Sequence, residues 1–178
     1  TAKLAHVSGA SLVDFNRSGT PLAEIVTKPN IRTPEEAGVF LRELRLIMRV
    51  VGASDADMEK GHLRCDANII LRPKGESKLY AKCEVKNLNS FRAVEHALAF
   101  EIERQAKLWE AGAPPTVTAT RGWNDATGET VAQREKEALH DYRYFPEPDI
   151  PPLAVTVEQV ELWRSELPEL PAARRTRY

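Results

Sequence analysis

Apolar residues recur at helical spacing in two stretches of the chain. The first covers residues 33–52 and opens with Thr33, Pro34 and Glu36, the order of a capping box, ahead of apolar positions three and four residues apart. The second runs from about residue 90 to residue 112, where a glycine predicts the end of the helix. The predicted apolar stripe of this second helix consists of Phe91, Val94, Leu98, Ile102, Ala106 and Trp109.

Between the two helices the pattern changes to an alternation with a period of two. Residues 62–72 and 79–86 alternate apolar and polar positions, which is typical of strands with one buried face. The sequence Pro73-Lys74-Gly75 between them favours a turn, so we expect an antiparallel hairpin. Its predicted buried face consists of Leu63, Cys65, Ala67, Ile69 and Leu71 on one strand and Leu79, Ala81, Cys83 and Val85 on the other.

The other segments carry weaker patterns. Residues 1–10 show no periodicity and are predicted to be a loop or the tail of a missing segment, whereas residues 11–16 and 21–28 are short β-like runs. Residues 116–134 predict a second hairpin that turns at residues 125–128.

The C-terminal part of the chain predicts a loop followed by a helix. Residues 140–152 are rich in aromatic residues and prolines, and proline removes backbone donors, so this segment is expected to be an ordered, irregular loop. Thr156 with Gln159 predicts the start of a short helix. Together these segments predict an α+β fold with antiparallel β-sheets and packed helices.

Composition narrows the class of protein. The chain has 178 residues, enough for one domain with a real core, and 25 Lys and Arg residues against 26 Asp and Glu residues give a formal charge of −1. This balance argues against a stand-alone nucleic-acid module that relies on a strong positive field. No apolar run approaches the roughly 18 residues of a membrane span, and two cysteines without CxxC spacing fit a reducing compartment. We therefore expect a soluble, cytoplasmic protein with no membrane partner.

The polar face of the predicted 62–86 hairpin is densely charged. A register symmetric about the turn would place Asp66 opposite Glu84 and Arg64 opposite Lys86. Like charges are unfavourable there unless an ion lies between them. A shift of two residues would pair Asp66 with Lys82 instead and give an ordinary salt-bridged surface. Spacing alone leaves both registers open.

Carboxylates on this face could hold a magnesium ion. Mg²⁺ takes one or two carboxylates and keeps several waters or substrate phosphates as its other ligands. Glu24 follows a Gly-Thr-Pro turn in a β-like run and is a second carboxylate that could converge on Asp66. The alternative for Glu24 is an ordinary exposed glutamate.

A phosphate site is the second candidate. Asn87, Asn89 and Arg92 lie where the predicted strand meets the second helix, and helix N-terminal amides favour anions. The alternative is that Asn89 or Ser90 only caps the helix. Arg143 lies in the aromatic loop, and such loops often carry functional residues.

Four strings of residues resemble a known family, in order and spacing. They are LVDFNRSGTPLAEIV at 12–26, HLRCDANI at 62–69, EVKNLNSF at 84–91 and HDYRYFPEPDIPPL at 140–153. They are similar to the B subunits of the bacterial aspartyl/glutamyl-tRNA amidotransferases, GatB. The resemblance implies that residues 1–153 are the central and C-terminal part of a glutamine-synthetase-like catalytic (kinase/transamidase) domain. It also implies that residues 154–178 are a linker helix and the start of a truncated helical domain.

The resemblance implies an ATP-dependent ligase that needs Mg²⁺. Such an enzyme phosphorylates the side-chain carboxylate of Glu-tRNA(Gln) or Asp-tRNA(Asn), and ammonia from glutamine then replaces the phosphate. The implied partners are the glutaminase (GatA) and GatC subunits of the amidotransferase and the misacylated tRNA. A fragment of this kind is expected to be inactive alone.

The family's functional residues carry over by motif. Glu24 and Asp66 match positions that the family uses as magnesium ligands, and the catalytic candidates are Arg64, Glu84 and Lys86. The candidates for contacts to ATP are Asn87, Asn89 and Arg143. Two other functions remain open: a non-catalytic module of the same fold that binds tRNA or protein, and another ATP-dependent carboxylate-amine ligase.

Overall fold

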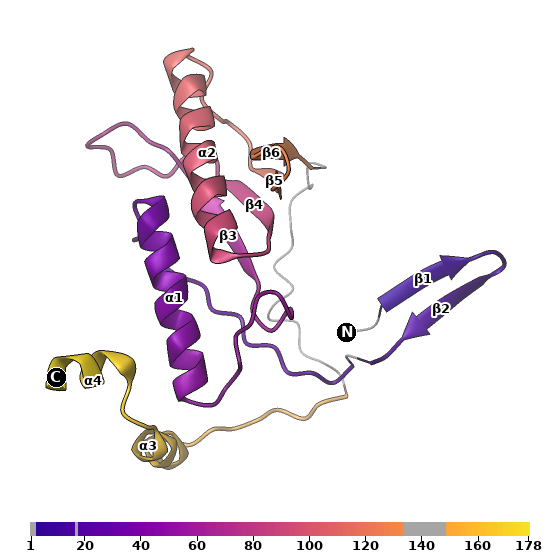
Figure 1. Ribbon diagram of the computed structural model, residues 1–178, viewed down its shortest axis with the longest axis vertical. Coiled ribbons are helices and arrows are strands. Elements are labelled where there is room, and N and C mark those ends of the chain that lie inside the picture. The colour runs from indigo at the N-terminus through magenta and orange to yellow at the C-terminus, as the bar shows by residue number, and fades with distance from the viewer. Residues whose placement is uncertain (1–2, 17, 134–148) are drawn as a thin grey trace. The chain divides into compact units, whose positions relative to one another are not determined.

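The computed structural model describes residues 3–16, 18–133 and 149–178. The chain divides into two compact units, Thr1–Asn30 and Ile31–Tyr178. Figure 1 shows the helices and strands of each. No helix among the described residues is long and apolar enough to cross a membrane.

The first unit is built on one hairpin. Strands β1 (Lys3–Val7) and β2 (Ala10–Asp14) pair antiparallel, with Val7 opposite Ala10 across a tight turn. Gly9 lies in that turn with φ +78°, a conformation that glycine adopts at little cost. The prediction of a loop is therefore wrong for residues 3–7 and for residue 10, because cross-strand pairing forms strands where the sequence shows no periodicity. The predicted β-like run at residues 21–28 is also not a strand.

The second unit contains a four-stranded mixed sheet. Its strands are β3 (Cys65–Ile69), β4 (Cys83–Leu88), β5 (Ala119–Asn124) and β6 (Glu129–Ala132), in the order β3-β4-β5-β6. The outer pairs are antiparallel, as predicted, but β4 and β5 are parallel because a helix carries the chain back between them. The second predicted hairpin is confirmed as β5 and β6. The α+β class is confirmed.

One helix covers a face of this sheet, and a second helix packs against the first. Helix α2 (Phe91–Glu110) packs on the strands, and α1 (Pro34–Val50) packs against α2 (Figure 1). The capping box predicted for α1 is present, since the Thr33 hydroxyl accepts from the Glu36 backbone N–H at 3.2 Å. Ser90, rather than Asn89, caps α2, with its hydroxyl accepting from Ala93 N–H at 3.0 Å.

The core lies between the helices and the sheet. Its buried members are Ala37, Leu41, Ile69, Cys83, Val85, Leu88, Ala93, Val94, Ala97 and Trp123. Of the stripe predicted for α2, only Val94 is fully buried, and Phe91, Leu98 and Ile102 pack at the edge of the core. The buried face of α2 instead follows the four-residue spacing of Ala93 and Ala97 and continues into polar residues.

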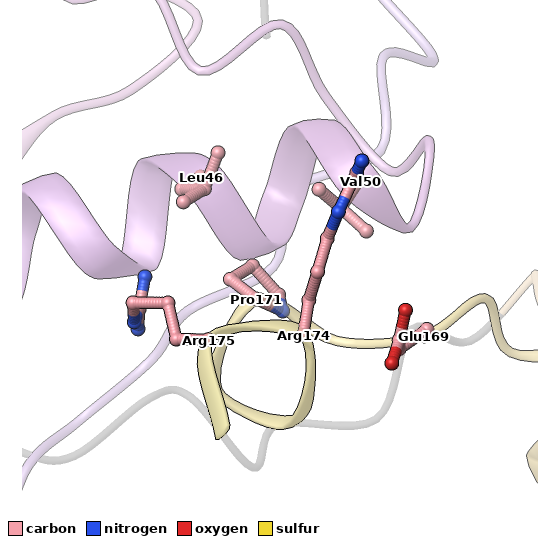
Figure 2. Close-up of a pocket in the computed structure, with 6 residues that line it drawn as sticks. All are labelled: Leu46, Val50, Glu169, Pro171, Arg174 and Arg175. Carbon is pink, nitrogen blue, oxygen red and sulfur yellow. The ribbon is translucent and has the colours of Figure 1, made fainter. Parts of the chain in front are cut away.

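The C-terminal residues form two short helices. Helix α3 (Val157–Glu166) begins with the predicted capping box of Thr156 and Gln159, and none of its residues is buried. Helix α4 (Pro171–Arg177) contacts α1, where Arg175 pairs with Glu43 at 2.5 Å. Figure 2 shows the pocket at this contact. It is lined by Leu46, Val50, Glu169, Pro171, Arg174 and Arg175.

Candidate functional site

A lysine joins two carboxylates on the sheet face opposite α2. Lys86 Nζ of β4 lies 3.0 Å from Asp66 Oδ2 of β3 and 3.2 Å from Glu84 Oε1 of β4. The Thr120 hydroxyl of β5 donates to Glu84 Oε2 at 3.4 Å. We call these four residues the polar sheet face. It combines two carboxylates, one ammonium group and one hydroxyl on three neighbouring strands.

The register that assembles this face is neither of the two predicted ones. Asn68, not Asp66, lies opposite Glu84, and Lys82 precedes the first paired residue of β4. The observed register places Lys86 beside Asp66, so that opposite charges meet across the strands. Over residues 67–69 the apolar alternation is kept, because the register there differs from the predicted ones by an even number of residues.

The connection between β3 and β4 explains the difference. Residues 70–82 form a long loop rather than a tight turn. Tyr80 packs edge-on against Trp109 near the end of α2, with ring centroids 4.9 Å apart, and Arg72 donates to the Ser77 carbonyl at 2.8 Å. These contacts hold the loop, so the Pro-Lys-Gly sequence does not set the register.

A β-bulge lies at the centre of the polar sheet face. The register shifts between Cys65 and Ala67, so that two residues of β4, Lys86 and Asn87, lie opposite Asp66 alone. Asn87 has φ +63°, which is uncommon for a residue other than glycine, although asparagine tolerates it best.

The bulge also decides which residues of β4 enter the core. Val85 is fully buried and Leu88 is 4% exposed, although three positions separate them. Without the bulge, strict alternation would turn Asn87 toward the core and Leu88 toward solvent. The sequence signal for the bulge is that two polar residues, Lys86 and Asn87, separate the apolar Val85 and Leu88, where a regular strand would have only one.

The two carboxylates keep Lys86 charged. Burial favours the neutral amine, but the hydrogen bonds and charges of Asp66 and Glu84 outweigh it and raise the pKa of Lys86 above its usual value. Lys86 is therefore a fixed positive charge at neutral pH.

The other predicted site residues are not among the four that form the polar sheet face. Arg64 is exposed one residue before β3, and Asn89 is exposed just before the cap of α2. Glu24 is exposed in the first unit, after β2. Arg143 lies outside the described residues. The roles predicted for these residues stay predictions.

The polar sheet face carries two carboxylates, which are ligands of the kind that bind magnesium. In the described parts of the chain, no three His, Cys, Asp or Glu side chains converge as a ready-made metal cluster. Asp66 and Glu84 nevertheless offer carboxylate oxygens to the same cation, the Lys86 ammonium. A pair of carboxylates suffices for Mg²⁺ when waters and substrate phosphates complete its shell.

The sequence prediction missed a buried carboxylate on the α2 side of the sheet. Glu101 is fully buried and accepts two hydrogen bonds of 2.9 Å from Arg104 and one of 3.2 Å from Gln105. Arg121 of β5 lies 3.1 Å away, and the Thr130 hydroxyl of β6 also donates to it. The sequence indicates the burial of Glu101 by its spacing, since Ala93, Ala97 and Glu101 follow one another at intervals of four residues and so lie on the same side of the helix.

The charge of Glu101 is maintained by these partners. Burial raises its pKa, but the hydrogen bonds from Arg104, Thr130 and Gln105 outweigh burial and hold the pKa below its usual value. Because its partners come from α2, β5 and β6, Glu101 ties the helix to the sheet.

The two cysteines behave as apolar residues, as predicted. Burial, together with the nearby Asp66 charge, raises the pKa of Cys65 to about 11. Burial is also the largest cause that raises the pKa of Cys83, to about 12. Both thiols are protonated at neutral pH and are poor nucleophiles.

Comparison with known proteins agrees with the resemblance. Residues 1–161 match the family described as the GatB/GatE catalytic domain. The B subunits of aspartyl/glutamyl-tRNA(Asn/Gln) amidotransferases are similar over nearly the whole chain. That of Roseiflexus sp. (strain RS-1) is 57% identical over 179 residues, covering 100% of this chain and 37% of that protein. That of Persephonella marina is 53% identical over 176 residues, covering 99% of this chain and 37% of that protein.

Proposed function

The chain belongs to the GatB/GatE catalytic domain family, and we propose that it forms part of the catalytic domain of a tRNA-dependent amidotransferase. The chain spans 37% of the length of each of these two relatives, so the whole reaction belongs to a longer protein and its partners. In the proposed reaction, the side-chain carboxylate of Glu-tRNA(Gln) or Asp-tRNA(Asn) takes a phosphoryl group from ATP. Ammonia derived from glutamine then forms the amide.

The chemistry requires activation because a carboxylate is a poor acyl donor to ammonia. Phosphorylation converts it into an acyl phosphate with a good leaving group. Magnesium, when bound, neutralises charge on the triphosphate. Asp66 and Glu84 are the carboxylates of the polar sheet face that would hold it, with Glu24 as the further ligand that the resemblance implies.

The position of Lys86 is the observation that best supports this proposal. A protonated lysine between two carboxylates lies on a polar sheet face, with 29% of its side chain exposed. Both substrates of the proposed reaction are anions at the reacting atoms, and Lys86 would attract them and oppose their mutual repulsion. Lys86 also orients Asp66 and Glu84, since both carboxylates pair with the same ammonium.

The remaining assignments follow from the resemblance and complete the proposal. Glu24 is a further magnesium ligand, and Arg64 contacts reacting phosphate or the acceptor end of the tRNA. Asn87, Asn89 and Arg143 contact ATP. Residues 1–153 belong to the catalytic domain, and residues 154–178 lead into a helical domain. The partners are the GatA and GatC subunits with the misacylated tRNA, in the cytoplasm.

The test replaces Asp66 in the full-length protein, within the complete amidotransferase complex. Asp66→Asn keeps the size of the side chain but removes its charge, so we expect a roughly hundredfold or greater loss of ATP-dependent amide formation, with the complex still assembled. Glu103→Gln is the matched control, because Glu103 is an exposed carboxylate on α2. Normal turnover by Asp66→Asn would refute the role of this face, and normal tRNA binding without any wild-type turnover would favour a binding module.

A further inference from the structure

We propose that the polar sheet face continues into a second subsite over Gly122, which binds an anionic oxygen of a substrate between the amides of Asn87 and Gln133. The inference rests on the proposed function and deepens it. The bound group is a phosphoryl or carboxylate oxygen, and both substrates of the proposed reaction carry one.

The absent side chain of Gly122 leaves room for two amide side chains beside Lys86. In the parallel pairing of β4 and β5, Gly122 is in register with Lys86, two residues after Thr120, which is in register with Glu84. Residues two apart on a strand share a face, so the absent side chain of Gly122 belongs to the polar sheet face. Gly122 does not have a positive φ, so its backbone does not require glycine.

Two amide side chains converge on this place. A Cβ added to Gly122 would overlap Nε2 of Gln133 and lie 2.9 Å from Nδ2 of Asn87. The two amides come from different strand segments: Asn87 from the bulge of β4, and Gln133 from the residue after β6. Within residues 3–16, 18–133 and 149–178, neither side-chain amide makes a hydrogen bond to another residue.

The bulge at Asn87 serves this arrangement. An asparagine with φ +63° is strained relative to extended backbone, and such strain persists only where surrounding structure holds it. In a regular strand, residue 87 would face the core. The bulge instead turns it to the face that carries Lys86, beside Gly122.

The chemistry of the three groups selects an oxygen acceptor. Lys86 presents ammonium hydrogens, and the nitrogens of Asn87 and Gln133 are amide donors. Donors gathered at one place bind carboxylate or phosphoryl oxygens, and hydrogen bonds to charged oxygens are stronger than those to neutral ones. A glycine inside a strand weakens that strand, and it often marks a place where a ligand or another backbone approaches closely.

The principal variant is Gly122→Ala in the full-length protein, within the complete amidotransferase complex. The added methyl occupies the subsite and displaces both amides, while alanine fits the backbone of Gly122. Loss of one hydrogen bond to a charged oxygen corresponds to roughly a tenfold to hundredfold weaker interaction. We therefore expect a rise of that size in the KM of one substrate.

Two arms of the experiment identify the source of the oxygen. If the subsite binds the γ-phosphate of ATP, the KM for ATP rises, and so does the Kd of a non-hydrolysable ATP analogue with Mg²⁺. If it binds the side-chain carboxylate, the KM for misacylated tRNA rises, and the Kd of misacylated tRNA rises while that of deacylated tRNA does not.

A second variant protects the test against misfolding. Gln133→Ala removes one amide and leaves the space open, so it should raise the same constant, and its effect should not add to that of Gly122→Ala. Glu129→Ala is the control, because Glu129 is exposed at the opposite end of β6. If both variants leave every one of these constants within twofold of the wild type, the proposal is overturned.

The binding arms separate this proposal from the proposed function. A wild-type complex that forms no amide would refute the proposed reaction. Weaker binding of the ATP analogue or the misacylated tRNA by Gly122→Ala would still support the subsite in that case.

Discussion

Replacing Glu101 with glutamine should weaken the attachment of α2 to the sheet. Glu101 is fully buried and holds two arginines, Arg104 at 2.9 Å and Arg121 at 3.1 Å, whose side chains are 26% and 19% exposed. Glutamine keeps the size of the side chain but leaves both guanidinium groups without their anion. Breaking a buried ion pair by removing one partner costs about 3–5 kcal/mol.

Amide hydrogen exchange in the full-length protein can measure this loss. At about 1.4 kcal/mol for each factor of ten, protection in α2, β5 and β6 should fall roughly hundredfold to several-thousandfold, where exchange reports the opening equilibrium. Glu103→Gln is the matched control on the same helix, because Glu103 pairs only at the surface, with Lys107 at 2.6 Å. A change of less than tenfold in Glu101→Gln would refute the view that Glu101 ties α2 to the sheet.

The same carboxylate predicts a pH dependence. Because the folded-state pKa of Glu101 is lowered from its ordinary value of 4.5, its stabilising contribution is present above the unfolded-state pKa. That contribution is lost as the pH falls below about 4.5 and passes through the lowered folded-state pKa. Below the ordinary pKa of 4.5, protection of α2 should therefore fall more steeply with decreasing pH in the wild type than in Glu101→Gln. Equal slopes would contradict the assignment.

Two further substitutions test the polar sheet face and the contact between helices. Lys86→Met removes the charge between the carboxylates, so amide formation by the assembled complex should fall by roughly 10²–10³, whereas Lys82→Met, at a position just before β4, should retain activity. Undiminished turnover by Lys86→Met would contradict the role of the ammonium. Gly38→Ala places a methyl of α1 where the Glu95 carboxylate of α2 lies and should cost about 1–3 kcal/mol, seen as faster hydrogen exchange in both helices. Unchanged exchange would show that Glu95 moves away freely.

The helix ends could be predicted from the sequence because their causes are local. The capping box of Thr33 and Glu36 and the cap at Ser90 each join residues three positions apart. The turn of the β5–β6 hairpin at residues 125–128 is also local, since it ends on Gly128 with φ +69°. Such contacts are nearly independent of the rest of the fold.

The candidate site could be predicted only in part. Its residues on β3 and β4 were predicted from their charge, from the alternation and from the family resemblance. The residues with which they pair across the strands were not predicted, because the register depends on a loop. That loop is held by Tyr80 against Trp109, 29 positions away along the chain. A shift of register by two residues changes which charges meet without altering the apolar pattern.

The sequence by itself determined the α+β class, the ends of α1 and α2, the start of α3, the family and the charged residues of the site. Three features required the tertiary structure: Lys86 between Asp66 and Glu84, the bulge at Asn87, and the burial of Glu101. Each depends on groups brought together from separate strands or helices. Their free energies come from burial and from pairs of charges across those elements, which local spacing does not specify.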